Sequence, residues 1–253
     1  MPTLSIIIAA KNEAHNIGDC VRSAAFANEV IVLDSGSTDA TADTARAAGA
    51  KVVATDWPGY GPQQSRGINL AKSDWVLSLD ADERISPALQ SEILQAIASP
   101  RADGYRLPRL SSLCGVFIHH GGWRPDYTLR LVKREKAGFT HHFLHAHMTV
   151  DGTKADLNES LIHYSYRDLD DVLEKLNRYA SGNAKDLDAK GVQGSMRKAI
   201  THGLWAFIRT WIFRAGFLDG RHGFMLAVYN AESTYYKYLK LLALQEARKS
   251  SAH

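Results

Sequence analysis

The sequence has few cysteines and no long apolar segment. Only two of the 253 residues are cysteine, Cys20 and Cys114, and they do not form a CxxC pair. This excludes a disulfide scaffold and gives no sign of an oxidising compartment. No run of about 18 apolar residues occurs, which excludes a conventional transmembrane helix. The first residues, MPTLSIIIAAKNE, have no basic stretch before their short apolar run, so we expect a core strand there rather than a secretory signal.

Two common nucleotide-binding fingerprints are also missing. No GxGxxG follows the first apolar run and no GxxxxGK[ST] occurs anywhere, which disfavours ordinary dinucleotide binding and P-loop chemistry. The composition is that of a folded globular protein, with 45% hydrophobic and 23% charged residues, so intrinsic disorder and collagen-like repeats are excluded. The length fits one large α/β domain or one domain with an appendage.

Charge is distributed unevenly along the chain. Residues 190–253 contain ten Lys and Arg against three Asp and Glu, whereas the preceding 189 residues contain 20 against 24. A slightly acidic body is therefore followed by a basic, aromatic segment. Such a segment suits an anionic surface, either a membrane or a nucleic acid.

Strand and helix patterns alternate over the first hundred residues. Continuous apolar runs predict buried strands, and apolar residues at helical spacing predict helices between them. Thr38 or Asp39 is expected to cap the second helix, and Ser86 followed by Pro87 opens the fourth. The expected strands are 4–9, 30–33, 51–55 and 75–79, and the expected helices are 12–25, one from about 40 to Gly49, 63–72 and one from 87, with a loop at 57–62. The alternation predicts an α/β fold with a parallel, doubly wound sheet.

The pattern changes further along the chain. Short strand-like segments separated by turns occupy 104–165, and the chain reads as helical from Leu169 onward. We therefore expect two parts: a sheet-based domain over 1–165, and a helical C-terminal extension over 166–253 that packs on it.

Polar residues that follow the predicted strands are the first candidates for a site. In open parallel sheets, ligands bind at the carboxyl ends of the strands. Asp80 and Asp82 end the fourth predicted strand, and two such carboxylates can share a hard cation such as Mg²⁺ or Mn²⁺. A solvated acidic turn is the alternative. Asp34 ends the second predicted strand, where it is placed to accept a hydrogen bond from a nucleobase or a ribose.

Six sequence blocks carry a resemblance to a known family. The first strand followed by Asn12-Glu13, then VLDSGSTDAT (32–41) and SDWVLSLDADE (73–83), resembles the inverting family-2 glycosyltransferases. Their GT-A fold is a Rossmann-like, mostly parallel sheet flanked by helices. The blocks HHGGWRPDYTLRLVKR (119–134), LIHYSY (161–166) and GFLDGRHGF (216–224) are similar to one branch, the lipopolysaccharide core β-1,4-glucosyltransferases of the WaaE/KdtX type.

The resemblance implies which residues bind the donor. Asp34 matches the acidic residue that contacts uridine, and Asp82 matches the metal ligand of a DxD pair whose Asp80 lies nearer the ribose. Arg66 sits where such enzymes often place a cation near the base or diphosphate, and a solvated helix face is the alternative. The full set implied for the nucleotide sugar is Ala9, Lys11, Asn12, Glu13, Asp34, Ser35, Arg66, Asp80 and Ala81.

The resemblance also implies a single displacement in which a general base activates an acceptor hydroxyl. Asp126 is the first candidate for this base. Alternatively, Asp126 has a structural role as a turn carboxylate that pairs with Arg124 or Arg130. The branch carries Glu where this chain has Ala146, so His145 is the second candidate.

Contact with the acceptor or the sugar is expected from Trp123, Arg124 and Arg130. Trp123 could offer a stacking face to a sugar ring, and a core aromatic under a loop is the alternative.

The basic C-terminal segment predicts contact with a membrane. Residues 196–218 combine Trp, Phe and Ile with Arg and Lys, the pattern of an interfacial amphipathic helix that attracts anionic lipids. A helix packed on the rest of the chain is the alternative. Nucleic-acid binding is disfavoured because the cations belong to an apolar, aromatic helix. We expect residues 196–221 to hold the protein peripherally on the inner, cytoplasmic face of a bacterial inner membrane.

Taken with the resemblance, these features lead to one expected function and two alternatives. The expected function is metal-dependent, inverting transfer of a hexose, with glucose implied, from a UDP-sugar to an inner-core heptose of lipid A-core. The first alternative keeps the chemistry but uses an undecaprenyl-linked or other surface glycan as acceptor. The second is a non-catalytic, membrane-peripheral scaffold with a degenerate nucleotide fold.

Overall fold

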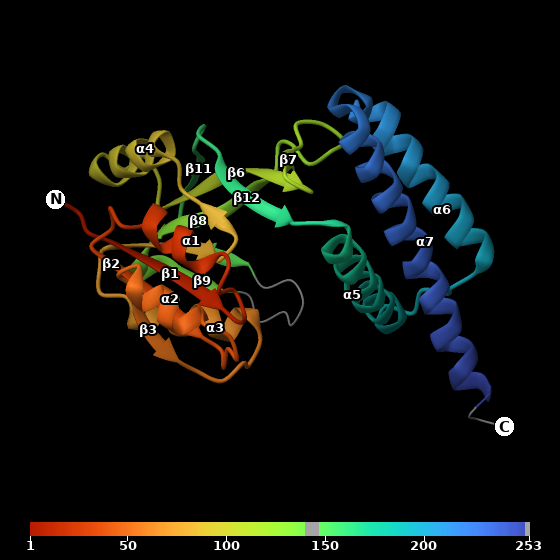
Figure 1. The fold of residues 1–253 in the computed structure, drawn as a ribbon, viewed down its shortest axis with the longest axis horizontal. Helices are drawn as coiled ribbons and strands as arrows, with labels where there is room; N and C mark the ends of the chain where they lie inside the picture. Colours follow the sequence, from red (N-terminus) through yellow and green to blue (C-terminus); the bar gives the residue numbers. More distant parts are fainter. Residues whose placement is uncertain (140–146, 251–253) are drawn as a thin grey trace. The chain divides into compact units, whose positions relative to one another are not determined.

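The structure, a computed structural model, describes residues 1–139 and 147–250. The chain forms two compact units whose boundary falls within two strands. The first unit contains residues 1–110 and 125–163, and the second contains residues 111–124 and the chain from 164 onward. The positions of the two units relative to one another are not determined (Figure 1).

The first unit is built on a sheet whose centre is parallel (Figure 1). The parallel strands are β3 (Lys51–Ala54), β2 (Glu29–Asp34), β1 (Leu4–Ala10) and β4 (Trp75–Asp80), in that order. The sheet continues through β8 (Tyr127–Lys133), β6 (Gly104–Leu113), β12 (Leu161–Tyr166) and β5 (Glu83–Arg84), and β11 (Lys154–Asp156) pairs with the start of β6. The short strand β7 (Val116–Phe117) pairs with the last residues of β6 within the second unit. A separate pair joins β9 (Ala137–Phe139) to β10 (Met148–Val150), and η1 (Arg134–Lys136) is a 3₁₀ turn. The predicted parallel, doubly wound core is confirmed.

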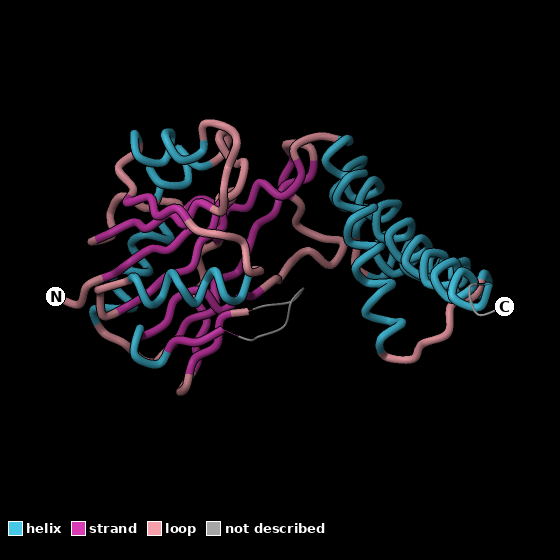
Figure 2. The backbone as a smooth tube through the Cα atoms, turned by 90° about the horizontal axis from the view of Figure 1, so that it is seen from below, coloured by secondary structure: helices cyan, strands magenta, loops and turns pink. Residues whose placement is uncertain are grey.

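The central strands bury both faces, as their continuous apolar runs predict. Successive side chains of a strand point to opposite faces. Leu4, Ile6 and Ile8 of β1 therefore join one core cluster, whereas Ile7 joins another that includes Ile68. The first cluster contains residues of helices α1 (Ile17–Ser23), α2 (Thr41–Ala47) and α4 (Pro87–Ala98), and the second contains residues of α3 (Tyr60–Leu70). Figure 2 shows helices on both sides of these strands.

Two helix boundaries differ from the predictions. Helix α1 begins at Ile17 rather than near residue 12, because Asn12 has a left-handed backbone with φ of 57° that a right-handed helix cannot contain. Helix α3 begins at Tyr60, inside the segment predicted as a loop.

One of the two predicted caps is wrong. Ala40 occupies the N-cap position of α2 without a side-chain cap, although Asp39 accepts a hydrogen bond from the backbone N–H of Thr41. The Ser86 cap of α4 is confirmed, since its hydroxyl accepts from the N–H of Leu89 at 3.1 Å.

The second unit is mostly helical. Helix α5 (Leu169–Ala189) and helix α6 (Met196–Ile208) both pack against the long helix α7 (Gly220–Ser250). The helix predicted over 196–218 is interrupted: α6 passes into a π-helical turn η2 (Arg209–Phe213), Ala215 adopts φ of 53°, and a 3₁₀ turn η3 (Gly216–Asp219) follows. Across the described part of the chain, no helix combines the length and apolarity that a bilayer crossing requires.

Candidate donor and catalytic site

The candidate site lies in the first unit, at the carboxyl ends of the central strands. In the strand register, Ala10 of β1 lies beside Asp34 of β2, and Ala9 lies beside Asp80 of β4. The predicted residues Ala9, Asp34 and Asp80 are therefore brought together at one edge of the sheet. This is the edge at which open α/β sheets bind ligands.

Asp34 presents a buried acceptor atom that has no partner. The residue is 8% exposed, its Oδ2 accepts only a long hydrogen bond (3.4 Å) from the backbone N–H of Ser37, and its Oδ1 is buried without a partner in the described part of the chain. Leaving a buried carboxylate oxygen unpaired is costly. The position therefore suits a ligand that donates a hydrogen bond.

The loops that follow β1 and β2 are tied together around this position. The backbone N–H of Asn12 donates to Ser37 Oγ at 2.9 Å, and Asn12 Oδ1 accepts from the N–H of Thr38 at 2.8 Å. The N–H of Glu13 donates to Thr41 Oγ1 at 2.7 Å. Lys11, the remaining predicted residue of the first loop, is exposed.

Helix α3 supports the loop that follows β2 through hydrogen bonds of Gln63. Gln63 is fully buried, and its amide donates to Ser35 Oγ at 2.9 Å and to Thr55 Oγ1 at 2.5 Å. Ser35 is itself 4% exposed. Arg66 carries an ion pair with Asp56 at 2.5 Å on the helix surface, so the guanidinium already has an anionic partner.

Asp80, whose side chain is partly exposed, belongs to a network of charges around the buried Glu83 that includes two residues absent from the sequence-based site. Arg130 Nη2 donates to Asp80 Oδ2 at 2.5 Å and to Glu83 Oε1 at 2.8 Å, and Glu83 Oε2 accepts from the N–H of Asp80 at 2.9 Å. Arg109 Nη1 lies 3.9 Å from Glu83 Oε1. Arg130, predicted to contact acceptor or sugar, thus also binds the first aspartate of the DxD pair.

The network shifts the acidity of its members in opposite directions. Burial raises the pKa of Glu83 to about 7 against the opposing charge of Arg130. Desolvation would also raise the pKa of Asp80, but the charge and hydrogen bonds of Arg130 hold it below its ordinary value. The Nε of Arg130 and the Oγ1 of Thr128, both on β8, are buried without partners in the portion of the chain that is described.

Asp82 is the DxD carboxylate that carries no ion pair to arginine within the described residues. Its Oδ2 lies 3.5 Å from Nε2 of His163 on β12, and the side chain is 24% exposed. No group of three or more His, Cys, Asp and Glu suited to a metal occurs in residues 1–139 and 147–250. Magnesium commonly uses one or two carboxylates together with substrate phosphates, and Asp82 beside Asp80 fits that kind of site. Ala81, between them, is buried, and its carbonyl accepts from Arg84 at 2.9 Å.

Asp126 is paired with an arginine that the sequence did not point to. Arg109 donates to Asp126 Oδ2 through Nε at 2.8 Å and through Nη2 at 2.5 Å. The expected alternative partners, Arg124 and Arg130, are not the ones that form this pair. The side chain of Asp126 is 38% exposed, and its Oδ1 has no hydrogen-bond partner among the described residues. The second base candidate, His145, lies outside the described residues.

Trp123 and Arg124 belong to the second unit. The indole of Trp123 stacks on the ring of Tyr166, with centroids 5.7 Å apart and planes 17° from parallel, in a small apolar cluster. One face of Trp123 is therefore already covered by an aromatic ring.

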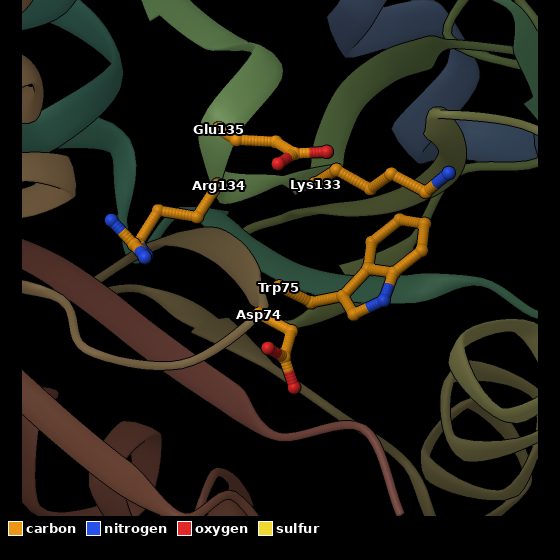
Figure 3. Close-up of a pocket in the computed structure, with 5 residues that line it drawn as sticks. All are labelled: Asp74, Trp75, Lys133, Arg134 and Glu135. Carbon is orange, nitrogen blue, oxygen red and sulfur yellow. The ribbon is translucent and has the colours of Figure 1, made fainter.

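A shallow pocket occurs at the opposite end of β4. It is lined by Asp74, Trp75, Lys133, Arg134 and Glu135 (Figure 3). Since Trp75 is the first residue of β4 and Asp80 is the last, this pocket is separate from the candidate site.

The residues that the sequence missed are Glu83, Arg109, Gln63 and His163. Glu83 directly follows the DxD pair in the sequence. That position was the only indication that it belongs to the site. Arg109 interrupts an apolar strand sequence, LPRL. A charged residue within a strand that also contains buried residues usually has an oppositely charged or hydrogen-bonding partner, and this was the available indication.

The sequence is similar to those of known glycosyltransferases. Residues 5–150 match the profile described as Glycosyl transferase family 2. An uncharacterised glycosyltransferase of Rickettsia bellii is 34% identical over 96% of this chain and 86% of its own length. The lipopolysaccharide core biosynthesis glycosyltransferase LpsC of Rhizobium meliloti is 26% identical over 93% of both chains.

A solved structure also resembles most of the chain. S. aureus TarS 1-349 has a TM-score of 0.51 at 14% identity, covering 97% of this chain and 92% of that one. This likeness concerns the fold, and together with the sheet topology it confirms the expected GT-A architecture. The family profile covers more than half of the chain, and the protein is therefore a member of glycosyl transferase family 2.

Proposed function

We propose that the protein is an inverting, metal-dependent hexosyltransferase that uses a UDP-sugar, with glucose as the first candidate, and an inner-core heptose of lipid A-core as acceptor. Support for the acceptor comes from LpsC, whose name places it in lipopolysaccharide core biosynthesis. The similarity between the two proteins covers 93% of the length of LpsC. The reaction is proposed to take place at the cytoplasmic face of the inner membrane, with the protein held peripherally.

The observation that carries the donor proposal is the unpartnered Oδ1 of Asp34. A uracil ring offers an N–H donor along its edge, and pairing it with this buried acceptor would remove the cost of the orphaned oxygen. Ser35, Asn12 and Glu13 would form the walls of the same pocket, with Lys11 at its exposed rim.

The diphosphate is proposed to lie at the end of β4. Asp82, with Asp80 beside it, would hold Mg²⁺ or Mn²⁺, which when bound neutralises charge on the departing diphosphate. Arg130 donates to Asp80, which we propose lies on the ribose side, while the Asp82 carboxylate, which has no arginine ion pair among the described residues, would be the main metal ligand.

Asp126 is the proposed general base. Arg109 fixes its Oδ2 and leaves Oδ1 to accept the proton of an acceptor hydroxyl. A carboxylate held in one orientation is suited to this role because a general base must lie within hydrogen-bond reach of the proton it removes.

The test is a donor titration. The purified protein is titrated with UDP-glucose, UDP-galactose and a GDP-sugar, with and without Mn²⁺, and UDP release is followed. We expect metal-dependent binding of a UDP-sugar that Asp34→Ala weakens about 10- to 100-fold, the loss of a charge-assisted hydrogen bond. Asp43→Asn, an exposed carboxylate of α2, serves as the matched control.

The acceptor and the scaffold alternative are separated in the same assay. Purified lipid A-core and an undecaprenyl-linked glycan are compared as acceptors, and the first is expected to accelerate UDP release. Absence of nucleotide-sugar binding with every metal would favour the non-catalytic scaffold and would make the assignment of Asp34, Asp80 and Asp82 wrong.

A further inference from the structure

The outer face of helix α6 and the turns that follow it is apolar and exposed. The side chains on this face range from 47% exposed at Met196 to 69% exposed at Phe213. Trp205 contacts Phe213 with ring centroids 5.5 Å apart, so the face continues across the π-helical turn. We call this set the α6 surface: Met196, Ile200, Leu204, Trp205, Ile212, Phe213, Phe217 and Leu218.

The opposite face of α6 explains why these large side chains are not needed in the core. Small residues face α7: Ala199, Gly203 and Ala206 are buried, and a Cβ placed on Gly203 would meet the carbonyl oxygen of Ala231 at 3.3 Å. Close packing of the two helices is therefore achieved by small residues. The large apolar residues are left on the outside, where contiguous exposure usually marks an interaction site.

The charge along the segment that carries most of the α6 surface has one sign. Residues 190–218 contain no Asp or Glu. Asp219, the first acidic residue after them, is 7% exposed and engaged by the backbone N–H groups of His119 and His120 and by the imidazole of His120. The cations that accompany the surface are Arg197, Lys198, Arg209, Arg214 and Arg221.

We propose that the α6 surface inserts into the interface of an anionic lipid bilayer. A helix with exposed Trp, Phe and Leu on one face and flanking Arg and Lys lies in the plane of the headgroups, where its apolar side chains enter the acyl boundary. The nearby cations gain from the negative surface potential of anionic lipids. A second copy of the chain is a poorer occupant, because two-fold association would place the same cations against one another.

This inference deepens the proposed function by naming a partner, but its test does not require transferase activity. The full chain is sedimented with vesicles of phosphatidylcholine alone and with vesicles containing about one-third phosphatidylglycerol. We expect stronger binding to the anionic vesicles, together with a blue shift of tryptophan emission. The double variant Trp205→Glu/Phe213→Glu is expected to lower the partition coefficient at least about tenfold.

Two further variants separate insertion from charge attraction. Arg197→Glu/Arg209→Glu is expected to lower binding to anionic vesicles about tenfold and to leave weak binding to neutral vesicles unchanged. Leu94→Glu, a change of the same kind at an exposed residue of α4 that is 41% exposed, is expected to have no effect. Donor binding is measured for every variant, so failure of the proposed function is seen independently of vesicle binding.

Three results would overturn the inference. The first is wild-type protein that binds UDP-sugar but not anionic vesicles. The second is vesicle binding by Trp205→Glu/Phe213→Glu equal to that of the wild type with both proteins folded by circular dichroism. The third is a dimer in light scattering that the same double variant converts to a monomer without any change in lipid binding.

Discussion

Arg109 holds Asp126 by a single oxygen: two of its N–H groups donate to Oδ2, at 2.8 and 2.5 Å. The backbones of the two residues are also joined, since the N–H of Arg109 donates to the carbonyl of Asp126 at 2.9 Å. The pair therefore connects the middle of β6 to the residue that precedes β8, and it fixes the direction of the free carboxylate oxygen.

If Asp126 is the general base, Asp126→Asn should lower kcat by about 10²- to 10⁴-fold, because the amide cannot accept the proton. The affinity for UDP-sugar should change little, since donor and base bind different groups. Steady-state kinetics and donor titration together measure both quantities. Arg109→Lys should cost less than Asp126→Asn, because it alters only the orientation of the carboxylate. An Asp126→Asn enzyme with normal kcat would remove Asp126 from the mechanism.

Asp82→Ala should abolish transfer while the protein stays folded. The reason is that Asp82 is the DxD carboxylate without an arginine ion pair among the described residues, and metal sites depend on such an open ligand. Chelation by EDTA should have the same effect on the wild type, and added Mn²⁺ should reverse it. Calorimetric titration with Mn²⁺ and UDP checks the binding itself. Retained turnover by Asp82→Ala would show that the metal assignment is wrong.

Arg130→Met should be strongly destabilising. Arg130 is 12% exposed and faces two carboxylates, one of which belongs to the fully buried Glu83. Removing one side of a buried ion pair costs about 3–5 kcal/mol, because the remaining charge is left without a partner. Urea denaturation measures this change. Adding Glu83→Gln to the Arg130→Met background should recover part of the loss, and a purely additive double variant would contradict the coupling.

Asp103 should make stability depend on acid. Hydrogen bonds from Lys133 and Lys136 and from the N–H of Thr153 hold the pKa of this carboxyl well below its ordinary value. A group whose pKa is lowered by folding contributes stability above its unfolded pKa of about 3.9 and loses that contribution as the pH falls toward the folded value. Asp103→Asn should therefore destabilise the protein at pH 7, and the difference from wild type should shrink below about pH 4. Denaturation midpoints across this range provide the check, with exposed Asp43→Asn as the comparison.

The parallel core could be predicted because its strands are continuous apolar runs. Central runs such as LSIIIA and WVLSL are long enough to bury both faces of a strand. The same topology explains why Asp34 and Asp80 could be placed at one edge: parallel neighbours end together. The structure confirms that these two residues lie at the same edge of the sheet. Their roles in binding remain predictions.

The elements that could not be predicted depend on tertiary contacts or on rare backbone angles. Arg109, Arg130 and Glu83 meet through strand pairing that joins distant segments, and no local periodicity encodes such a meeting. The late start of α1 follows from the left-handed Asn12. The end of α6 was missed because apolar residues continue at helical spacing beyond Ile208, with no glycine or proline before Gly216.

The hydrogen bonds between the first two loops would affect how quickly the proposed donor binds. Asn12 already holds Ser37 and Thr38 in the free protein, and Gln63 already holds Ser35. If these loops bind the donor base as proposed, their hydrogen bonds are already formed before it arrives, so binding should cost little additional conformational entropy. Association at the base end of the donor should then show a single, concentration-dependent phase, and any slower rearrangement in the catalytic cycle must come from another part of the enzyme.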